Sequence, residues 1–327
     1  MNRKQQRQLW LSEYFKQHTF EMTTASADAS FRSYYRVTTP SGSYILMDAP
    51  PTHEDCRPFI KTLKILQQKQ VHVPSLFAAD LEQGFLLLSD FGSTLYLDVL
   101  NEETVDTYYL PAIDVIVSMQ NIDAAHDLPL YDASLLMDEM QLFSDWFVQE
   151  HLGFSLSAEQ TALLKNTYEK LLANALDQPQ VMVHRDFHSR NLMVTAENHP
   201  GVIDFQDAVW GPFTYDLASL LKDCYINWPE TTIERLCQYF LKIHNTTSRQ
   251  QITYQTFKRW FDLMAAQRHL KAIGIFCRLN YRDGKPGYLH DIPRTMKYLL
   301  KTSQAYPDLA SFGQLLQELQ PKLVKHG

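Results

Sequence analysis

The sequence of 327 residues lacks several features that would point to other classes of protein. No apolar run is long enough to span a bilayer, and no signal-type apolar segment follows the basic first residues. The four cysteines are widely scattered and show no paired metal-ligand spacing, which suits a reducing compartment. We therefore expect a cytoplasmic protein with no membrane partner.

Positive charge is also scarce. The 30 Lys and Arg residues are outnumbered by 37 Asp and Glu residues, which gives a formal net charge of −7. An acidic chain has no general affinity for nucleic acid, so we expect no nucleic-acid partner. Hydrophobic residues make up 45% of the chain, enough at this length to bury a large core in two lobes.

The first 90 residues are rich in predicted strands. Residues 31–37 alternate apolar and polar side chains, and a turn at residues 39–42 leads into the apolar run 44–47. This pattern predicts an antiparallel hairpin. Residues 76–79 and 85–88 predict two further strands.

The pattern after residue 90 is that of helices. Apolar stripes over residues 105–119 and 136–147 recur at helical spacing, and a capping box at Ser157 opens another helix. Together the two regions predict an α+β protein, with a small antiparallel-sheet lobe at residues 1–90 and a mainly helical lobe at residues 91–327.

The most informative segment reads VHRDFHSRN at residues 183–191 and is followed by VIDF at residues 202–205. In phosphoryl transfer from ATP, an Asp accepts the proton of the acceptor hydroxyl and an Asn five residues later holds a metal ion. A second Asp on the neighbouring strand holds the metal against the nucleotide phosphates. Asp186, Asn191 and Asp204 fit these three roles.

The residues between the three explain their spacing. Apolar runs at 192–194 and 202–203 flank a turn cluster at 197–201, so we expect them to pair as a hairpin. Such a hairpin would bring Asn191 and Asp204 to one edge. Mg²⁺ prefers hard oxygen ligands and keeps water and phosphate oxygens in its remaining positions, so one amide and one carboxylate suffice. The predicted cofactors are ATP and Mg²⁺.

Neighbouring residues receive supporting roles. We interpret His184 as orienting the loop by hydrogen bonding rather than as an acid or base. Asp90-Phe91-Gly92 imitates the metal-binding tripeptide of protein kinases but precedes the catalytic loop, so we assign Asp90 to a hinge beside the nucleotide. Asp207 either contacts a second metal or the substrate, or hydrogen-bonds nearby backbone, and both interpretations stay open.

The motif HRDFHSRN, then IDFQD and then YDLA resemble the aminoglycoside phosphotransferase and choline kinase superfamily, and the resemblance spans nearly the whole chain. It implies a bilobal protein-kinase-like fold and phosphorylation of a small-molecule hydroxyl. It further implies that Asp186 is the catalytic base, that Asn191 and Asp204 bind Mg²⁺, and that Asp216 braces the catalytic loop.

Five longer segments carry a more specific resemblance, at residues 47–51, 54–59, 84–90, 215–225 and 268–276. They are similar to the bacterial anomeric N-acetylmuramate/N-acetylglucosamine kinases of cell-wall recycling. That similarity implies transfer of the ATP γ-phosphate to the C1 hydroxyl of an N-acetylated amino sugar, giving a sugar 1-phosphate. The expected partner is therefore a small-molecule amino-sugar acceptor.

One departure from the kinase pattern concerns the nucleotide. Protein kinases place a Lys on the third strand to hold the α- and β-phosphates, whereas residues 44–48 contain none. The segment 25–32 also lacks glycine, so backbone amides and the Ser30 hydroxyl would have to cradle phosphate. Arg32 is the candidate for the missing charge. The alternative is that Arg32 is a solvated residue of an alternating strand.

The acceptor pocket is less clearly specified. Asp223, Tyr225 and Arg268 lie where this fold places its acceptor, and aromatic faces with polar groups suit a sugar. An Arg could also pair with the lactyl carboxylate of N-acetylmuramate. A helical lobe needs many surface Arg and Asp residues in any case, so we expect only some of the charged residues in this region to touch substrate.

Three functions compete at this point. The first is an anomeric amino-sugar kinase. The second is a kinase of another small alcohol, such as choline, an aminoglycoside or a sugar at a different hydroxyl, whose cationic members need carboxylates or an aromatic cage. The third is a non-catalytic nucleotide-binding regulator, which the missing strand lysine permits and the intact set of Asp186, Asn191 and Asp204 disfavours.

Overall fold

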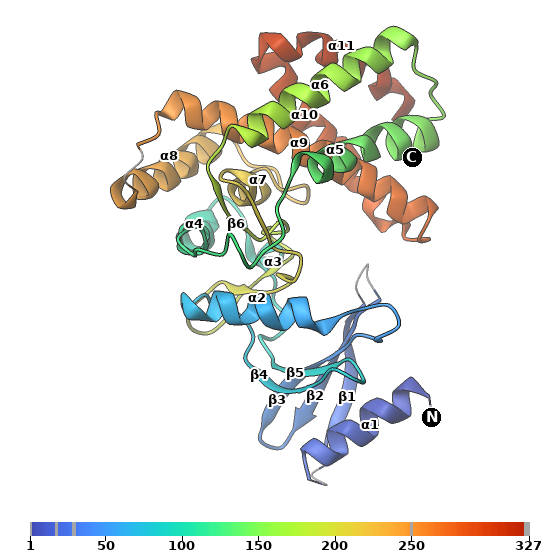
Figure 1. The fold of residues 1–327 in the computed structure, drawn as a ribbon, viewed down its shortest axis with the longest axis vertical. Coiled ribbons are helices and arrows are strands. Elements are labelled where there is room, and N and C mark those ends of the chain that lie inside the picture. Colours follow the sequence, from blue (N-terminus) through green and yellow to red (C-terminus); the bar gives the residue numbers. More distant parts are fainter. Residues whose placement is uncertain (1, 17–18, 28–30, 249–250, 324–327) are drawn as a thin grey trace. The chain divides into compact units, whose positions relative to one another are not determined.

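The computed structural model describes residues 2–16, 19–27, 31–248 and 251–323 (Figure 1). The chain divides into two compact units, which are described separately. The first unit comprises residues 1–94 and 193–207, and the second comprises residues 95–192 and 208–327. The sequence patterns predicted one boundary between the two lobes, after residue 90. In the described ranges, no helix is both long and apolar enough to cross a membrane.

The first unit is built on a five-stranded antiparallel sheet with strand order β1-β2-β3-β5-β4. The predicted hairpin is present, because Val37 pairs with Tyr44 across a turn that closes at Thr39 and Gly42. The strands are β1 (Glu21–Ala27), β2 (Ser33–Thr39), β3 (Gly42–Asp48), β4 (Leu76–Asp80) and β5 (Phe85–Ser89).

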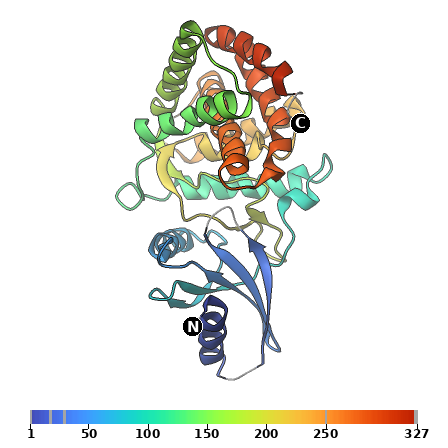
Figure 2. The same ribbon diagram turned by 90° about the vertical axis from the view of Figure 1, so that its right-hand side faces the viewer.

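Two helices accompany this sheet. Helix α1 (Arg3–Tyr14), which the sequence patterns did not predict, begins with a capping box at Asn2 and lies beside the sheet (Figure 2). Its Leu11 is buried in one cluster with sheet residues such as Leu46 and Phe85. Helix α2 (Cys56–Gln68) has Pro58 in its first turn, as its sequence predicts, and the Asp55 side chain caps it by accepting from Arg57 N. Its buried residues include the predicted stripe of Phe59, Leu63 and Leu66.

A distant part of the sequence completes the first unit. Strand β7 (Leu192–Met193) pairs with β8 (Gly201–Val202), which is the short hairpin expected from the turn cluster. Val202 N donates to the His72 carbonyl at 2.8 Å, and the ring of Phe205 lies 4.8 Å from that of Phe59. Because the segment bonds to and packs on the first unit, residues 193–207 belong to it.

Helices dominate the second unit, and α9 (Tyr254–Tyr281) is its central element. It packs against α5 (Ala133–Leu142), α6 (Ala158–Leu176), α7 (Tyr215–Leu221), α10 (Ile292–Ala305) and the π-helix η1 (Phe143–His151). The other helical elements are α3 (Tyr96–Val99), α4 (Val105–Gln120), α8 (Glu230–Thr247), η2 (Pro286–Asp291), η3 (Pro307–Leu309) and α11 (Ala310–Leu323).

One predicted helix differs from the expectation. The stripe over residues 136–147 is not a single α-helix, since the chain widens into the π-helix at Phe143. Helix α9 approaches closely here, and a Cβ built on Gly274 would lie 2.4 Å from the carbonyl carbon of Leu142. The side chains of Phe143 and Phe147 stay buried all the same. The apolar spacing therefore predicted burial correctly and the hydrogen-bonding pattern incorrectly.

A short antiparallel ladder positions the motif segment in the second unit. Strand β6 (Gln180–Val183) pairs with β9 (Val209–Pro212), with Val183 opposite Val209. Helix α7 starts shortly after β9 ends. The loop that follows β6 therefore starts beside the first turn of α7, where Asp216 lies.

Candidate active site

The catalytic loop is held from its start by Asp216. This carboxylate is 1% exposed and accepts hydrogen bonds from the backbone N–H groups of His184, at 2.7 Å, and Arg185, at 3.1 Å. Arg185 has a φ of 77°, a strained conformation for a residue other than glycine. Burial raises the pKa of Asp216 to about 7, although the two N–H groups oppose the shift. The brace therefore fixes the backbone just before Asp186.

Asp186 lies in a field of positive charge. Burial acts to raise the pKa of its carboxyl, but the charges of Lys271 and His188, followed by two arginines, lower it to about 2. The carboxyl is therefore ionised at neutral pH and can accept a hydrogen bond from an acceptor hydroxyl. Asn191 Nδ2 donates to the backbone oxygen of Asp186 at 2.9 Å, which turns the amide oxygen of Asn191 away from that bond.

A buried ionic network supports the loop from below. Glu139, which is 6% exposed, bonds Arg185 Nη2 at 2.5 Å and lies 3.2 Å from Lys271 Nζ. It also accepts a hydrogen bond from the hydroxyl of Tyr131. Burial acts to raise the pKa of Glu139, but Lys271 and Arg185 lower it, so the carboxyl is ionised. Glu139 thereby holds the side chains of two cations that face Asp186.

The sequence reasoning missed this network. Glu139 and Lys271 are far apart in the chain; Glu139 belongs to no motif, and Lys271 lies in the similar segment 268–276 without an assigned role. The available signal was an acidic residue inside the apolar stripe over residues 136–147. A carboxylate at a buried helical position needs cationic partners, so Glu139 could have been identified as a polar core residue, although not its partners.

Asp223 holds the far end of the loop. Its carboxylate is 1% exposed and accepts hydrogen bonds from Ser189 N at 3.0 Å and Ser189 Oγ at 2.5 Å. It also accepts from Tyr225 N at 3.0 Å. Both oxygens are thus engaged with backbone and hydroxyl groups of this unit. The predicted contact between Asp223 and substrate stays a prediction.

Tyr225 and Arg268 approach the loop from two sides. The Tyr225 ring lies under the guanidinium of Arg190, with 3.7 Å from Cζ to the ring centroid, and 5.3 Å from the ring of His188. Arg268 is 8% exposed, lies over the Tyr215 ring and has a buried Nε with no hydrogen-bond acceptor among the described residues. Each of these predicted acceptor residues therefore lies near the loop in the second unit.

The remaining predicted residues lie in the first unit. Arg32 forms an ion pair with Glu54 at 3.0 Å, and Asp207 adds to the negative field around it. Asp90 accepts hydrogen bonds from Arg36 Nε at 2.6 Å and Ser43 Oγ at 2.5 Å, and from the N–H of Gly92. Ser30 lies outside the described residues.

Asp204 follows β8 with a φ of 65°, another left-handed residue other than glycine. Its Oδ1 accepts from Gln206 Nε2 at 2.7 Å. The Oε1 of Gln206 is buried without a hydrogen-bond partner in the described structure. The strained backbone at Asp204 indicates that the direction of this carboxylate is imposed by its surroundings.

The donor set suits magnesium in its chemistry. Asn191 and Asp204 supply an amide oxygen and a carboxylate oxygen, which are hard ligands of the type that Mg²⁺ takes. Over the described ranges, no three His, Cys, Asp or Glu side chains gather into a metal-holding group. Mg²⁺ bound beside phosphates does not need a site made of protein ligands alone, because the ion keeps water and phosphate oxygens among its ligands.

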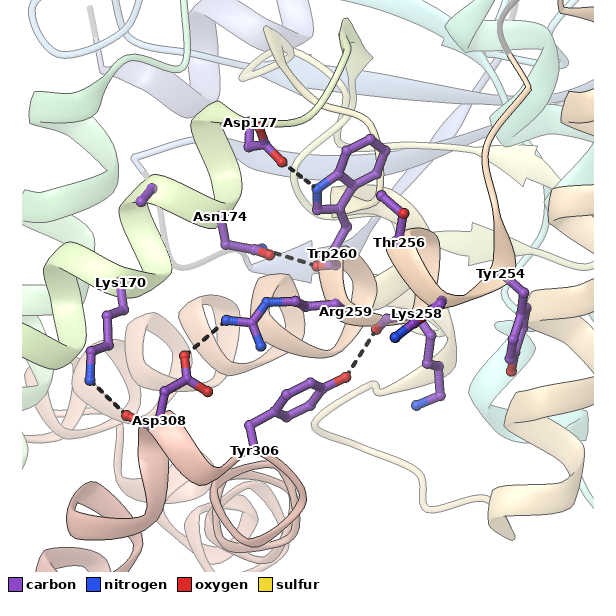
Figure 3. A pocket seen from close by; sticks show the side chains of 12 residues that line it. Lys170, Asn174, Asp177, Tyr254, Thr256, Lys258, Arg259, Trp260, Tyr306 and Asp308 are labelled. Atoms are coloured by element: carbon purple, nitrogen blue, oxygen red, sulfur yellow. Dashed lines mark hydrogen bonds and ion pairs between the residues drawn. The ribbon is translucent and has the colours of Figure 1, made fainter.

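A separate pocket of about 880 Å³ lies in the second unit, among α6, the first turns of α9 and the segment that leads into α11 (Figure 3). Its charged groups already have partners: Arg259 bonds the Asp308 carboxylate at 2.8 Å, and Lys170 bonds the Asp308 carbonyl at 2.7 Å. None of the predicted site residues that the structure describes lines it. We assign it no part in catalysis.

Comparison with family models decides the family. The model of the phosphotransferase enzyme family (APH) matches residues 21–252, which include the catalytic loop and both bracing carboxylates. The chain belongs to this family. It is 47% identical to an N-acetylmuramate/N-acetylglucosamine kinase of Pseudomonas aeruginosa over 91% of this chain and 88% of that protein. It is 42% identical to a protein of the same name from Pseudomonas putida over 97% of both.

Solved structures show the same fold at low sequence identity. A Plasmodium vivax ethanolamine kinase superposes with a TM-score of 0.61 at 14% identity, covering 92% of this chain and 87% of that one. A GDP complex of aminoglycoside 2′-phosphotransferase-IIIa also gives 0.61, at 13% identity, covering 95% and 99%. The expected kinase-like fold, with an antiparallel sheet followed by a helical region, is therefore confirmed. The chain is a phosphotransferase.

Proposed function

We propose that the protein transfers the γ-phosphate of ATP to the C1 hydroxyl of N-acetylmuramate or N-acetylglucosamine, giving the sugar 1-phosphate for cell-wall recycling in the cytoplasm. The names of the relatives in two Pseudomonas species support the choice of acceptor, since these relatives match nearly the full chain. The observation that carries the chemistry is the ionised, half-buried Asp186 at the centre of a braced loop.

Asp186 is the residue that we assign to the acceptor hydroxyl. Its low pKa makes it a weak base in the ground state, so it first orients the hydroxyl by accepting its hydrogen bond. The proton moves to Asp186 as the oxygen bonds to phosphorus and its acidity rises. Lys271 and Arg268 lie close enough to lower the Asp186 pKa, and their charge also opposes the negative charge that develops during transfer.

Asn191 and Asp204 are the residues that would hold Mg²⁺. Bound there, Mg²⁺ would supply positive charge that offsets the charge of the nucleotide phosphates. For the nucleotide, we assign the charge that replaces the strand lysine to Arg32. Its ion pair with Glu54, next to α2, resembles in type the Lys–Glu pair that orders the phosphate site of protein kinases. Ser30 and Asp90 keep their proposed places beside the nucleotide.

Cationic acceptors fit this unit less well. Aminoglycosides and choline carry positive charge and need carboxylates or an aromatic cage. Glu139, Asp216 and Asp223 are each buried and committed to supporting contacts. Arg268, by contrast, brings positive charge to the loop. An electrically neutral or anionic acceptor is therefore favoured.

The proposal is tested with a panel of acceptors incubated with ATP and magnesium. The panel contains N-acetylmuramate, N-acetylglucosamine, their C1 methyl glycosides, choline and an aminoglycoside. We expect the two free sugars to be phosphorylated, with a phosphorus NMR signal coupled to the anomeric proton, and the methyl glycosides to be inert. Phosphorylation of a methyl glycoside, or of choline or the aminoglycoside alone, would refute the assignment.

A further inference from the structure

Three arginines of the second unit stand apart from the others. Among the residues that the structure describes, the other arginines have a carboxylate oxygen within 4.0 Å, whereas Arg190, Arg268 and Arg278 have none. An unpaired guanidinium near a binding site is the group best suited to take a carboxylate, because its planar fork matches the two oxygens.

The two acceptors named in the proposed function differ in one chemical group that matters here. N-acetylmuramate carries a lactyl ether on C3 that ends in a carboxylate, and N-acetylglucosamine has a hydroxyl there. A site that accepts both must offer a cation to the carboxylate and must leave that cation stable when the carboxylate is missing. An isolated buried arginine would satisfy only the first condition, because an unpaired buried charge is costly.

Arg190 meets both conditions. Its guanidinium lies over the ring of Tyr225 at 3.7 Å and within 5.8 Å of the ring of Tyr288, and it is half-buried. Stacking on a ring face offsets part of the cost of its charge and leaves the N–H donors on the guanidinium edge free to bind. None of its nitrogens is among the buried unsatisfied atoms, so they remain accessible in the described structure.

The backbone around Arg190 is fixed in advance. The carboxylate of Asp223 binds the N–H and hydroxyl of Ser189, the residue before Arg190, and also the N–H of Tyr225. One buried group thus fixes the backbone of Tyr225 and of the residue before Arg190. Because the guanidinium is also stacked on the Tyr225 ring, Arg190 is preorganised for a ligand.

The other two unpaired arginines fit this task less well. Arg268 is among the charges that lower the pKa of Asp186, which places it beside the reacting hydroxyl rather than at a substituent two ring carbons away. Arg278 lies about 15 Å further along α9, at a rise of 1.5 Å per residue. Its field comes from Arg282, Asp283 and Glu139, and burial together with Arg282 lowers its pKa.

We propose that Arg190, stacked on Tyr225, binds the carboxylate of the anionic acceptor and sets the preference between N-acetylmuramate and N-acetylglucosamine. This inference rests on the proposed function. In the neutral sugar complex the guanidinium keeps its aromatic partner, so the same site serves both acceptors.

The test compares Arg190→Met with wild type on both sugars. We expect kcat/KM for N-acetylmuramate to fall about ten- to hundredfold, the usual effect of losing a charge-assisted hydrogen bond, mainly through KM. The value for N-acetylglucosamine should stay within about threefold, which also shows that the variant is folded. Arg190→Lys should recover part of the loss. Arg259→Met, which removes an arginine paired with Asp308, serves as the control and should change neither.

The methyl ester of N-acetylmuramate completes the cycle. Wild type should lose a similar factor on the ester, and Arg190→Met should lose little more, because the two changes remove the same contact. Equal losses on both sugars in Arg190→Met, no loss on either, or independent effects of variant and ester would each overturn the assignment of Arg190. Failure of wild type to phosphorylate either sugar would instead overturn the proposed function, on which the assignment depends.

Discussion

The two units use their arginines differently. In the first unit, every arginine that the structure describes pairs with a carboxylate; Arg3 and Arg7, for example, both bind the buried Asp48. Among the described residues of the second unit, Arg190, Arg268 and Arg278 lack such a partner, and two of them lie by the catalytic loop. The difference shows where positive charge stabilises the fold and where it is left available for an anion.

The largest expected effect concerns Asp186, whose pKa the unpaired Arg268 helps to lower. Asp186→Asn should lower kcat by about a hundred- to ten-thousandfold, because the acceptor hydroxyl loses its proton acceptor. Steady-state kinetics with saturating ATP and sugar measure it. Asp114→Asn, which alters an exposed acid bonded to Tyr239, should leave kcat unchanged. A kcat near that of wild type in Asp186→Asn would mean that Asp186 is not the proton acceptor.

The second test asks whether the buried network differs from a surface pair. Glu139→Gln should lower the free energy of unfolding by about 3 kcal/mol, because Arg185 and Lys271 lose their buried counter-charge. Asp106→Asn removes a half-exposed pair with Arg235 and should cost less than about 1 kcal/mol. Urea unfolding measures both. Equal losses of unfolding free energy in the two variants would show that Glu139 does not stabilise the loop as a buried counter-charge.

The third test concerns Arg32, which pairs with a carboxylate (Glu54) like the other described arginines of the first unit but is also assigned to the nucleotide phosphates. We expect Arg32→Met to raise KM for ATP about five- to tenfold, since a charge-assisted phosphate contact is lost, and to leave KM for the sugar nearly unchanged. Arg32→Lys should recover part of the effect. Arg57→Met, which removes an exposed arginine paired with Asp55, is the matched control. A defect confined to the sugar would move Arg32 into the acceptor pocket.

The last test extends the comparison to buried carboxylates, because Asp48 is held by two arginines whereas Asp216 bonds backbone N–H groups. The pKa of Asp216 is about 7 in the folded protein and about 3.9 in the unfolded chain, so the folded state binds the proton more tightly. Its contribution to stability is present below about pH 4 and is lost as the pH rises through about 7, by at most about 1.4 kcal/mol per pH unit.

Urea unfolding of wild type and Asp216→Asn between about pH 4 and pH 8 isolates this slope, because other groups cancel in the difference. We expect the stability of wild type relative to the variant to fall across this range. Parallel curves for the two proteins would show that Asp216 stays ionised throughout.

The sequence predicted what is local in the chain. The spacing of Asp186 and Asn191 identified the loop, and the turn cluster before Val202 identified the short hairpin. Apolar periodicity located most strands and the helices α2, α4, α5 and α6, whereas α8 to α11 were predicted only as part of a mainly helical lobe. Turn residues and the spacing of apolar residues predict such elements, because both depend on a few neighbouring residues.

What the sequence could not predict depends on contacts between distant residues. The pairing of Glu139 with Lys271, and the stacking of Arg190 on Tyr225, join segments with no local signal for each other. The π-helix also escaped, because Phe143 and Phe147 have the spacing of an α-helix while the close approach of Gly274 to Leu142 is tertiary. Each of these features is decided by packing rather than by propensity.

The return of residues 193–207 to the first unit has a consequence for how the protein is made. During synthesis the strands of the sheet are made first. The His72 carbonyl has its hydrogen-bond donor, Val202 N, and Phe59 has the ring of Phe205 only after residues 193–207 have been made. The ribosome must finish the catalytic loop before the N-terminal unit can close around that segment. A gene fragment that stops at Thr94 would therefore encode an incomplete unit, and the two units cannot be separated by a single cut.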